Sequence, residues 1–157
     1  MDICVLSVGK ISTPWIRQGI EQFESRINNY TKFATVIIPD LKNSKSLSTE
    51  KIKDEEGKAL LSNLTLSDIV VLMDERGKEF TSRGYSEWIQ KQMNSGRKRL
   101  VFIIGGPFGF SQEMYNRADF LIALSKMTFT HEMAKLFLSE QIYRSMTILK
   151  GEPYHHD

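Results

Sequence analysis

Five short apolar runs, with helix-like segments between them, constrain the fold more than any other feature of this sequence. The runs cover residues 3–8, 34–38, 68–74, 100–104 and 120–124. Each is nearly continuous in apolar residues, which is typical of strands buried on both faces of a parallel sheet. A first helix is predicted from Thr13-Pro14, with proline suited to the first helical position, and further helices over about 49–63, 82–95, 112–116 and 130–150. The alternation predicts a single α/β domain over residues 1–157, with a mostly parallel sheet covered by helices on both faces.

Chain length and cysteine usage indicate the class of protein. The 157 residues suit one domain with a sizeable core. Cys4 is the only cysteine, so no internal disulfide can form, and we expect a small buried side chain in a reducing compartment. No apolar run approaches the roughly 20 residues of a membrane span, and the start MDICVLSVGK has no basic leader. We therefore expect a cytoplasmic protein.

Three loops follow predicted strands and are candidates for ligand binding, because open α/β sheets bind ligands beyond the carboxyl ends of their strands. They are the polar turn expected at 75–78 after Asp74, the loop 105–109 and the loop 125–130. The second has the spacing GGxxG, whose glycines allow close approach to the main chain. It matches neither the GxGxxG fingerprint nor a P-loop. The spacing fits a tight structural turn as well as a cofactor loop.

His131 and Glu132 open the last helix with the first half of a zinc-protease signature. That signature needs a second histidine four residues after the first, and Lys135 stands there. A metal site would have to recruit His155 or His156, since no cysteine cluster is present. The alternative is a polar His131 bonded locally and a Glu132 carboxylate that complements the helix dipole.

The last helix is apolar over more than one face, so it must be buried on more than one side. Either a subunit interface or a central position in a monomer would explain this. The tail after the helix is polar and ends in Glu152-Pro-Tyr-His-His-Asp157. Tyr154 and His155 can donate, accept and stack, so the tail can complete a site.

The charge of the chain indicates less about its function than the strand-end loops do. The formal net charge is +2, which permits an RNA partner without arguing for one. The run Arg97-Lys98-Arg99 is the densest positive feature, and either a solvated loop or a few phosphate contacts would account for it. The segment KIKDEEGK is expected to be a solvated helix face.

Four segments carry a family resemblance when they are taken together. They read SVGK near the start, FIIGGPFG, LSKMTF with its following histidine, and EQIYRSMTILKGEPYH near the end. In order and spacing they resemble the RlmH-type ribosomal RNA methyltransferases of the SPOUT class, over essentially the whole chain. The resemblance implies an α/β fold with a deep trefoil knot in its C-terminal part. It also implies a homodimer with each site near the subunit interface.

The same resemblance implies the reaction and its cofactor. The family transfers a methyl group from S-adenosylmethionine to N3 of a pseudouridine in helix 69 of 23S ribosomal RNA, in the assembled ribosome. Carried over by position, the cofactor contacts fall on Met73, Gly105 and the segment 124–129, while Gly106 and Gly109 shape the glycine loop. The segment consists of Leu124, Ser125, Lys126, Met127, Thr128 and Phe129.

Some positions depart from the family pattern. Met73 stands where relatives often have leucine, a volume-conserving exchange. Thr130 stands where relatives often have proline, and it can cap the last helix instead. Glu132 lies where relatives differ, which weakens a catalytic role for it. Phe108 and Phe110 lie in a variable stretch of the glycine loop.

Methyl transfer from a sulfonium is an in-line displacement that depends mainly on positioning. The pseudouridine N3 carries a proton, so a base can assist. His155 and Tyr154 are the candidates near the target base, Arg144 for a phosphate or for orienting the base, and His131 for supporting the site. Positioning without a protein base is the alternative. Two other functions remain open, a non-catalytic RNA-binding protein and a metal-dependent hydrolase at His131.

Overall fold

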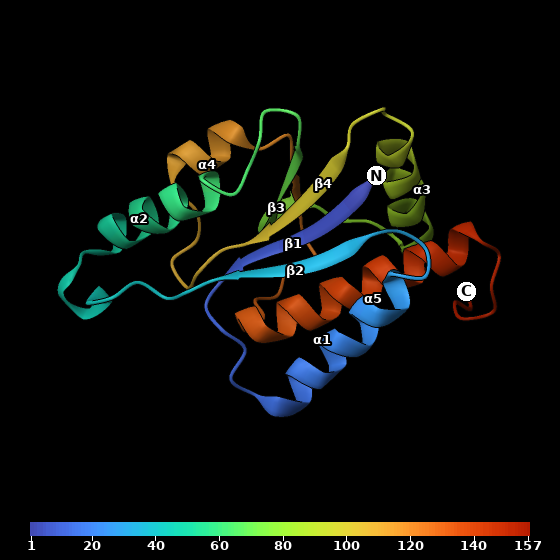
Figure 1. Ribbon diagram of the computed structural model, residues 1–157, viewed down its shortest axis with the longest axis horizontal. Coiled ribbons are helices and arrows are strands. Elements are labelled where there is room, and N and C mark those ends of the chain that lie inside the picture. Colours follow the sequence, from blue (N-terminus) through green and yellow to red (C-terminus); the bar gives the residue numbers. More distant parts are fainter.

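A five-stranded sheet forms the centre of the molecule in the computed structural model, which describes residues 1–157 (Figure 1). The strands are β1 (Asp2–Val8), β2 (Phe33–Ile38), β3 (Ile69–Lys78), β4 (Arg99–Ile104) and β5 (Phe120–Ile122). All pairings are parallel, in the order β2-β1-β4-β3-β5. The predicted parallel α/β sheet is confirmed.

Helices cover both faces of this sheet, as the sequence predicts. On one face, α5 (His131–Leu149) packs between α1 (Pro14–Ile27) and α3 (Ser82–Met93). On the other lie α2 (Thr49–Leu61) and α4 (Gln112–Arg117). A short 3₁₀ turn, η1 (Ser44–Ser46), connects β2 to α2. The last four helices end within two residues of the predicted limits.

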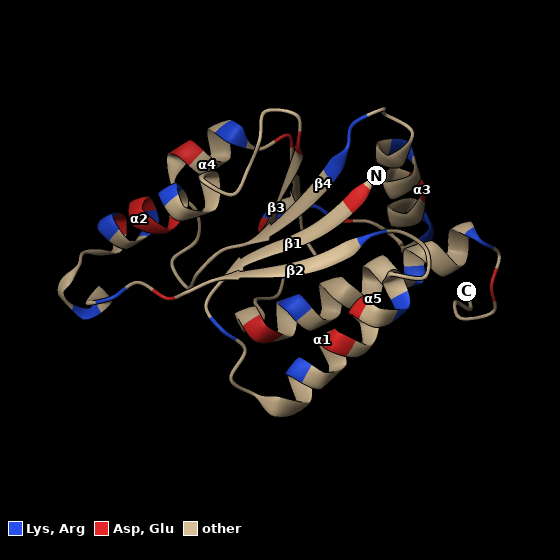
Figure 2. Cartoon of the chain, viewed as in Figure 1, with Lys and Arg blue, Asp and Glu red and all other residues tan.

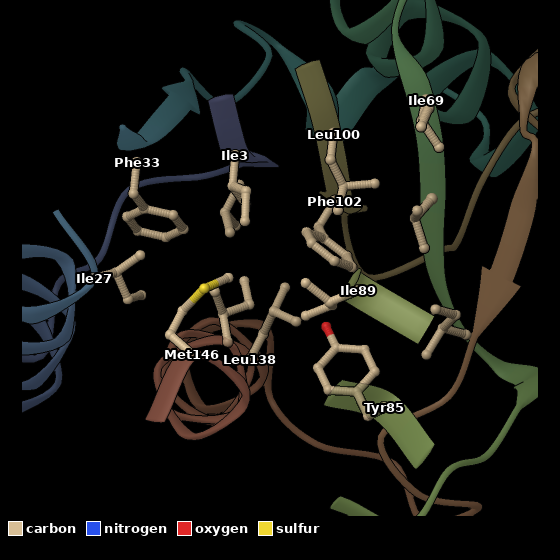
Figure 3. Packing of buried hydrophobic residues seen from close by; sticks show 14 of the residues in the cluster. Ile3, Ile27, Phe33, Ile69, Tyr85, Ile89, Leu100, Phe102, Leu138 and Met146 are labelled. Atoms are coloured by element: carbon tan, nitrogen blue, oxygen red, sulfur yellow. The ribbon is translucent and has the colours of Figure 1, made fainter. Parts of the chain in front are cut away.

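The alternation of side chains along each strand divides the core in two. In β1, Ile3 and Val5 join the cluster beneath α1, α3 and α5, whereas Cys4 and Leu6 join the cluster beneath α2 and α4. Figure 3 shows the first cluster, in which Phe102 of β4 lies among side chains of the helices. Each fully buried aliphatic or aromatic side chain contributes about 1.5–3 kcal/mol. Cys4 is buried, as predicted.

One predicted loop is wrong. The polar stretch 75–78 is not a turn, because β3 continues through it to Lys78 with an irregularity in its pairing to β5. Gly77 makes this possible: a Cβ at that position would lie 2.5 Å from the main-chain nitrogen of Ile122. The two backbones therefore pass closer than any side chain would allow. β5 is also shorter than predicted, which leaves Leu124 in the following loop.

The apolar last helix occupies a central place within one chain. Its buried face includes polar side chains that bond along the helix, such as Ser139, which donates to the carbonyl of Lys135 at 2.9 Å. Phe137 is 41% exposed and contacts the Phe129 ring at a centroid distance of 5.3 Å. The helix therefore serves the core and also keeps an exposed aromatic surface. The trefoil knot stays a prediction.

None of the helices combines the length and the apolar character that crossing a membrane requires.

Candidate active site

A broad cleft of about 2000 Å³ opens at the carboxyl ends of the strands. Three segments from strand ends line it, residues 73–76, 104–110 and 124–130 without Lys126. The loop after β1 and the first turns of α1 and α5 form the opposite wall. The structure thus brings the predicted cofactor residues together, apart from Lys126. Their roles as cofactor ligands remain predictions.

The glycine loop is shaped by what lies behind it. A Cβ on Gly105 would lie 2.9 Å from the Phe110 ring, and one on Gly106 would lie 2.5 Å from Oε2 of Glu56. Gly109 has a φ of +84°, in the left-handed region that favours glycine. From the sequence, Gly105 is expected to leave room for a cofactor against the main chain. The structure gives another physical reason, because Gly105 makes room for the buried Phe110.

The segment 124–129 presents both main chain and apolar side chains to the cleft. The Ser125 hydroxyl accepts from the main-chain N–H of Met127 at 3.0 Å, which holds a turn. Thr128 donates to Glu75 Oε2 at 2.9 Å and so ties the segment to the end of β3. Met127 is 75% exposed within the cleft lining. An apolar side chain this exposed in a concave site is suited to cover a ligand.

A polar cluster of Asp74, Arg76 and Tyr115 at the rim of the cleft was missed by sequence reasoning. Tyr115 donates to Asp74 Oδ2 at 2.5 Å, and Arg76 pairs with the same carboxylate at 3.3 Å while its guanidinium lies 5.2 Å from the Tyr115 ring. Burial would raise the pKa of Asp74, but hydrogen bonds from Arg76 and Tyr115 lower it overall. The group is therefore a fixed anionic support that holds one cation at the cleft.

Glu132 fastens the two helices that form the other wall. Its carboxylate accepts from the Thr13 hydroxyl at 2.7 Å, from the Ser12 hydroxyl at 3.1 Å and from both main-chain N–H groups. The Thr13 hydroxyl and the Ser12 N–H lower the pKa of Glu132 to about 2. An interaction with the helix dipole, which the sequence predicts for Glu132, therefore accounts for only part of its contacts. Glu132 holds the start of α1, and Thr130 caps α5 as predicted by accepting from the Met133 N–H at 3.3 Å.

Lys135 stands where a zinc protease would have its second histidine, and the structure gives it a different role. Its side chain is fully buried, and Nζ donates to the carbonyl of Gly9 at 2.7 Å. Burial lowers its pKa, against the charges of Glu132 and Asp40. His131 is exposed and lines the cleft. The structure contains no group of three or more histidine, cysteine, aspartate or glutamate side chains placed to hold a metal ion.

The remaining candidates lie at the other end of α5. Arg144 and Tyr154 both donate to Glu140 Oε1, at 2.5 and 2.9 Å, and Arg144 meets His155 Nδ1 at 3.1 Å. Because a guanidinium only donates, His155 Nδ1 accepts and its Nε2 carries the proton toward Asp157, 3.1 Å away. Arg144 follows His131 by 13 residues of α5, a rise of about 20 Å, and the tail folds back to contact Arg144. The structure joins Arg144, Tyr154 and His155 and separates them from the cleft.

Two of the three residues of the basic run are bound within the chain, and Lys98 is exposed. Arg99 pairs with the buried Asp68 at 2.5 Å, and Arg97 donates to the carbonyls of Leu66 and Ser67. The run lies at the start of β4, at the opposite edge of the sheet from the cleft. It serves mainly to join β4 to the loop before β3.

Comparison with known proteins assigns this architecture to a class. Residues 1–155 match the family described as "Predicted SPOUT methyltransferase", and the chain belongs to that family. It is also similar over its whole length to proteins named "Ribosomal RNA large subunit methyltransferase H". The identity is 52% over 156 residues with the protein of Christiangramia forsetii (99% of each chain) and 48% over 156 residues with that of Flavobacterium johnsoniae (99% of each). It is 46% over 157 residues with that of Parabacteroides distasonis (100% of each).

Proposed function

We propose that this methyltransferase uses S-adenosylmethionine to methylate N3 of a pseudouridine in helix 69 of 23S ribosomal RNA, in the assembled ribosome in the cytoplasm. One observation carries the proposal: three segments at strand ends, which contain the predicted cofactor residues apart from Lys126, line one cleft in a chain that matches a methyltransferase family along its length. The full-length likeness to ribosomal RNA methyltransferases supports the RNA substrate.

The cleft residues fit such a donor. The cofactor supplies a methyl group on a cationic sulfonium, and its departure leaves a neutral thioether that needs neither acid nor metal. Met73, Leu124 and Met127 form apolar surface that excludes water from the reacting atoms. The glycine loop and the segment 124–129 offer main-chain groups for the polar parts of the donor. The chain's main contribution is to hold the methyl group in line with the nucleophile.

The tail residues would act on the substrate. His155 and Tyr154 are proposed to lie beside the target base, where one of them assists removal of the N3 proton. Arg144 would hold a phosphate or orient the base, and His131 would support the cleft wall. In the single chain Nδ1, the one basic nitrogen of this His155 tautomer, accepts from Arg144, so His155 must release Arg144 before it can take the N3 proton.

A homodimer would bring these groups to the cleft. Within one chain Arg144 and the tail bound to it lie about 20 Å along α5 from His131, too far for a single site. A two-fold axis that pairs α5 antiparallel with its copy would place one chain's tail at the other chain's cleft. The exposed aromatic side chains Trp15 and Phe137 at the cleft end of α1 and α5 support a partner there. We therefore propose that each site takes its cofactor loops from one subunit and its tail from the other.

Label transfer tests the proposal. Purified protein is mixed with methyl-labelled S-adenosylmethionine and ribosomes that contain or lack the target pseudouridine. Label is expected only in large-subunit RNA of the ribosomes with pseudouridine. Labelling of neither preparation would overturn the proposed function. RNA binding without affinity for the cofactor would favour the non-catalytic alternative. The contacts of Arg97 and Arg99 within the chain count against that alternative, because they engage the side chains that were to bind RNA.

A further inference from the structure

A buried carboxyl group behind the glycine loop has no assigned task. Glu56 of α2 is 7% exposed, and its Oε1 has no hydrogen-bond partner. Leaving a buried carboxyl oxygen unpaired costs free energy, so such groups are rare unless they have a function. The segment around it was expected to be a solvated face. Its neighbours Asp54 and Lys58 are indeed exposed, and α2 carries several exposed ion pairs (Figure 2).

The position of Glu56 connects it to the cleft. A Cβ on Gly106 would lie 2.5 Å from Oε2 and 2.7 Å from Oε1, so the carboxyl group lies directly against the main chain of the loop. The next residue, Gly57, is packed just as closely, since a Cβ there would lie 2.5 Å from the Ser111 hydroxyl. Gly106 lines the cleft on its other side. Glu56 therefore supports the loop from behind.

The surroundings supply no positive charge. The charged group that acts on Glu56 is Asp40, which follows β2 and also lines the cleft. The ammonium of Lys53, one turn earlier on α2, is paired with Glu50 at 3.3 Å. The glycine loop and Ser111 contribute no ionisable side chain. Burial and the charge of Asp40 raise the pKa of Glu56.

We propose that Glu56 is a positioning residue for the methyl donor: in the donor-bound state its ionised carboxylate accepts N–H groups of the Gly105–Gly109 loop and fixes the loop against the donor. The unpaired Oε1 is the free acceptor that this requires. The positive charge of a sulfonium donor in the cleft favours the ionised form. The inference rests on the proposed function of the cleft, and it adds a residue that lies outside the cleft lining.

The proposal couples a proton to donor binding. In the free protein, part of the Glu56 population is protonated at a pH where an ordinary glutamate is ionised. Binding selects the carboxylate, so a proton is released and affinity falls as pH decreases through the raised pKa. Glu56→Gln keeps one acceptor oxygen but cannot titrate. Its affinity for the donor should be about tenfold weaker at pH 8 and should converge with that of the wild type at low pH.

Calorimetry of S-adenosylmethionine binding provides the test. Titrations at one mildly acidic pH, in buffers of different ionisation enthalpy, count the protons released. The wild type should release a fraction of a proton more than Glu56→Gln. Glu56→Asp, which retains an ionisable group, should keep part of the release. Asp54→Asn, an exposed change on the same helix, should match the wild type.

Thermal unfolding separates positioning from a merely structural role. Glu56→Gln removes an unpaired buried charge, so its melting temperature at pH 8 should equal or exceed that of the wild type. A lower melting temperature with unchanged proton release would overturn the inference. Equal affinity and equal proton release in wild type and Glu56→Gln would overturn it as well, while leaving the proposed function intact. Failure of the wild type to bind the donor would overturn both.

Discussion

The tail end of α5 and the cleft differ in how completely their polar groups are satisfied. At the tail end, Glu140, Arg144, His155 and Asp157 bond in a chain that continues to Arg83, which pairs with Asp157 at 2.6 Å. Behind the cleft, by contrast, Oε1 of Glu56 on α2 has no hydrogen-bond partner, and Met127 in the cleft lining is largely exposed. An unpaired acceptor and an exposed apolar side chain are features that a ligand site would use. The tail end is complete within the chain and must exchange contacts if it is to act elsewhere.

Gly105→Val should have the largest effect at the cleft end. The added side chain would collide with the Phe110 ring, displace the glycine loop and reduce cofactor affinity by at least about 100-fold. Calorimetry measures the loss. Adding Phe110→Leu frees space behind the loop and should restore part of the affinity. Normal binding by Gly105→Val would contradict the placement of the cofactor, and a complete lack of rescue would contradict the role of Phe110.

His155→Ala should affect the tail end differently. Methyl transfer should fall by about 100-fold or more, since a general base contributes at least that much. Cofactor affinity should stay within about threefold of the wild type, because the proposal places His155 beside the target base rather than against the cofactor. His156→Ala is the matched control and should be nearly neutral. If His155→Ala lowers both quantities equally, its role on the substrate side is wrong.

Glu132→Gln tests the contact that fixes α1 against the cleft end of α5. The folded-state pKa of Glu132 is lowered to about 2, so its stabilisation is present above its ordinary pKa and is lost as pH falls toward 2. At pH 7 the melting temperature should drop by a few degrees, and the difference should narrow below about pH 4.5. Glu21→Gln, exposed on α1, is the control. Identical melting curves at pH 7 would count against the contact.

The smallest effect is expected for Lys98→Gln, at the edge of the sheet remote from the cleft. Methyl transfer should stay within about twofold of the wild type, and the salt dependence of ribosome binding should not change. Lys10→Gln, an exposed change in the cleft wall, is the comparison and should reduce the salt slope by about one phosphate contact. A larger change in salt slope for Lys98→Gln than for Lys10→Gln would indicate that the basic run, and not the cleft wall, contacts the RNA.

The sequence predicted the features that depend on local pattern. Continuous apolar runs identified the buried strands, and Thr130 was identified as a cap because its side chain acts on the next turn. Strand direction then places three segments at the carboxyl ends of the strands, which is why the predicted cofactor residues other than Lys126 lie together. Lys126 was included by position alone, and its side chain lies outside the cleft lining.

Features that depend on packing between distant segments were missed. The extension of β3 rests on the close approach of Gly77 to β5, which no local pattern records. Glu56 follows Ile52 by four residues and precedes Leu60 by four, so helical spacing already placed it on the buried face of α2. The charges around it concealed that signal. The predicted helix over 130–150 already separates His131 from the tail, but no local pattern records that the tail folds back so that Tyr154 and His155 contact Glu140 and Arg144.

A purified mixed dimer tests most directly the claim that the two ends of α5 meet across subunits. One subunit carries Gly105→Val and the other carries His155→Ala. If loops and tail combine between chains, one site holds both defects and the other holds none, so the dimer should retain about half of the wild-type methyl transfer. If each tail serves its own cleft, both sites carry one defect, and the loss of nearly all activity would contradict the account.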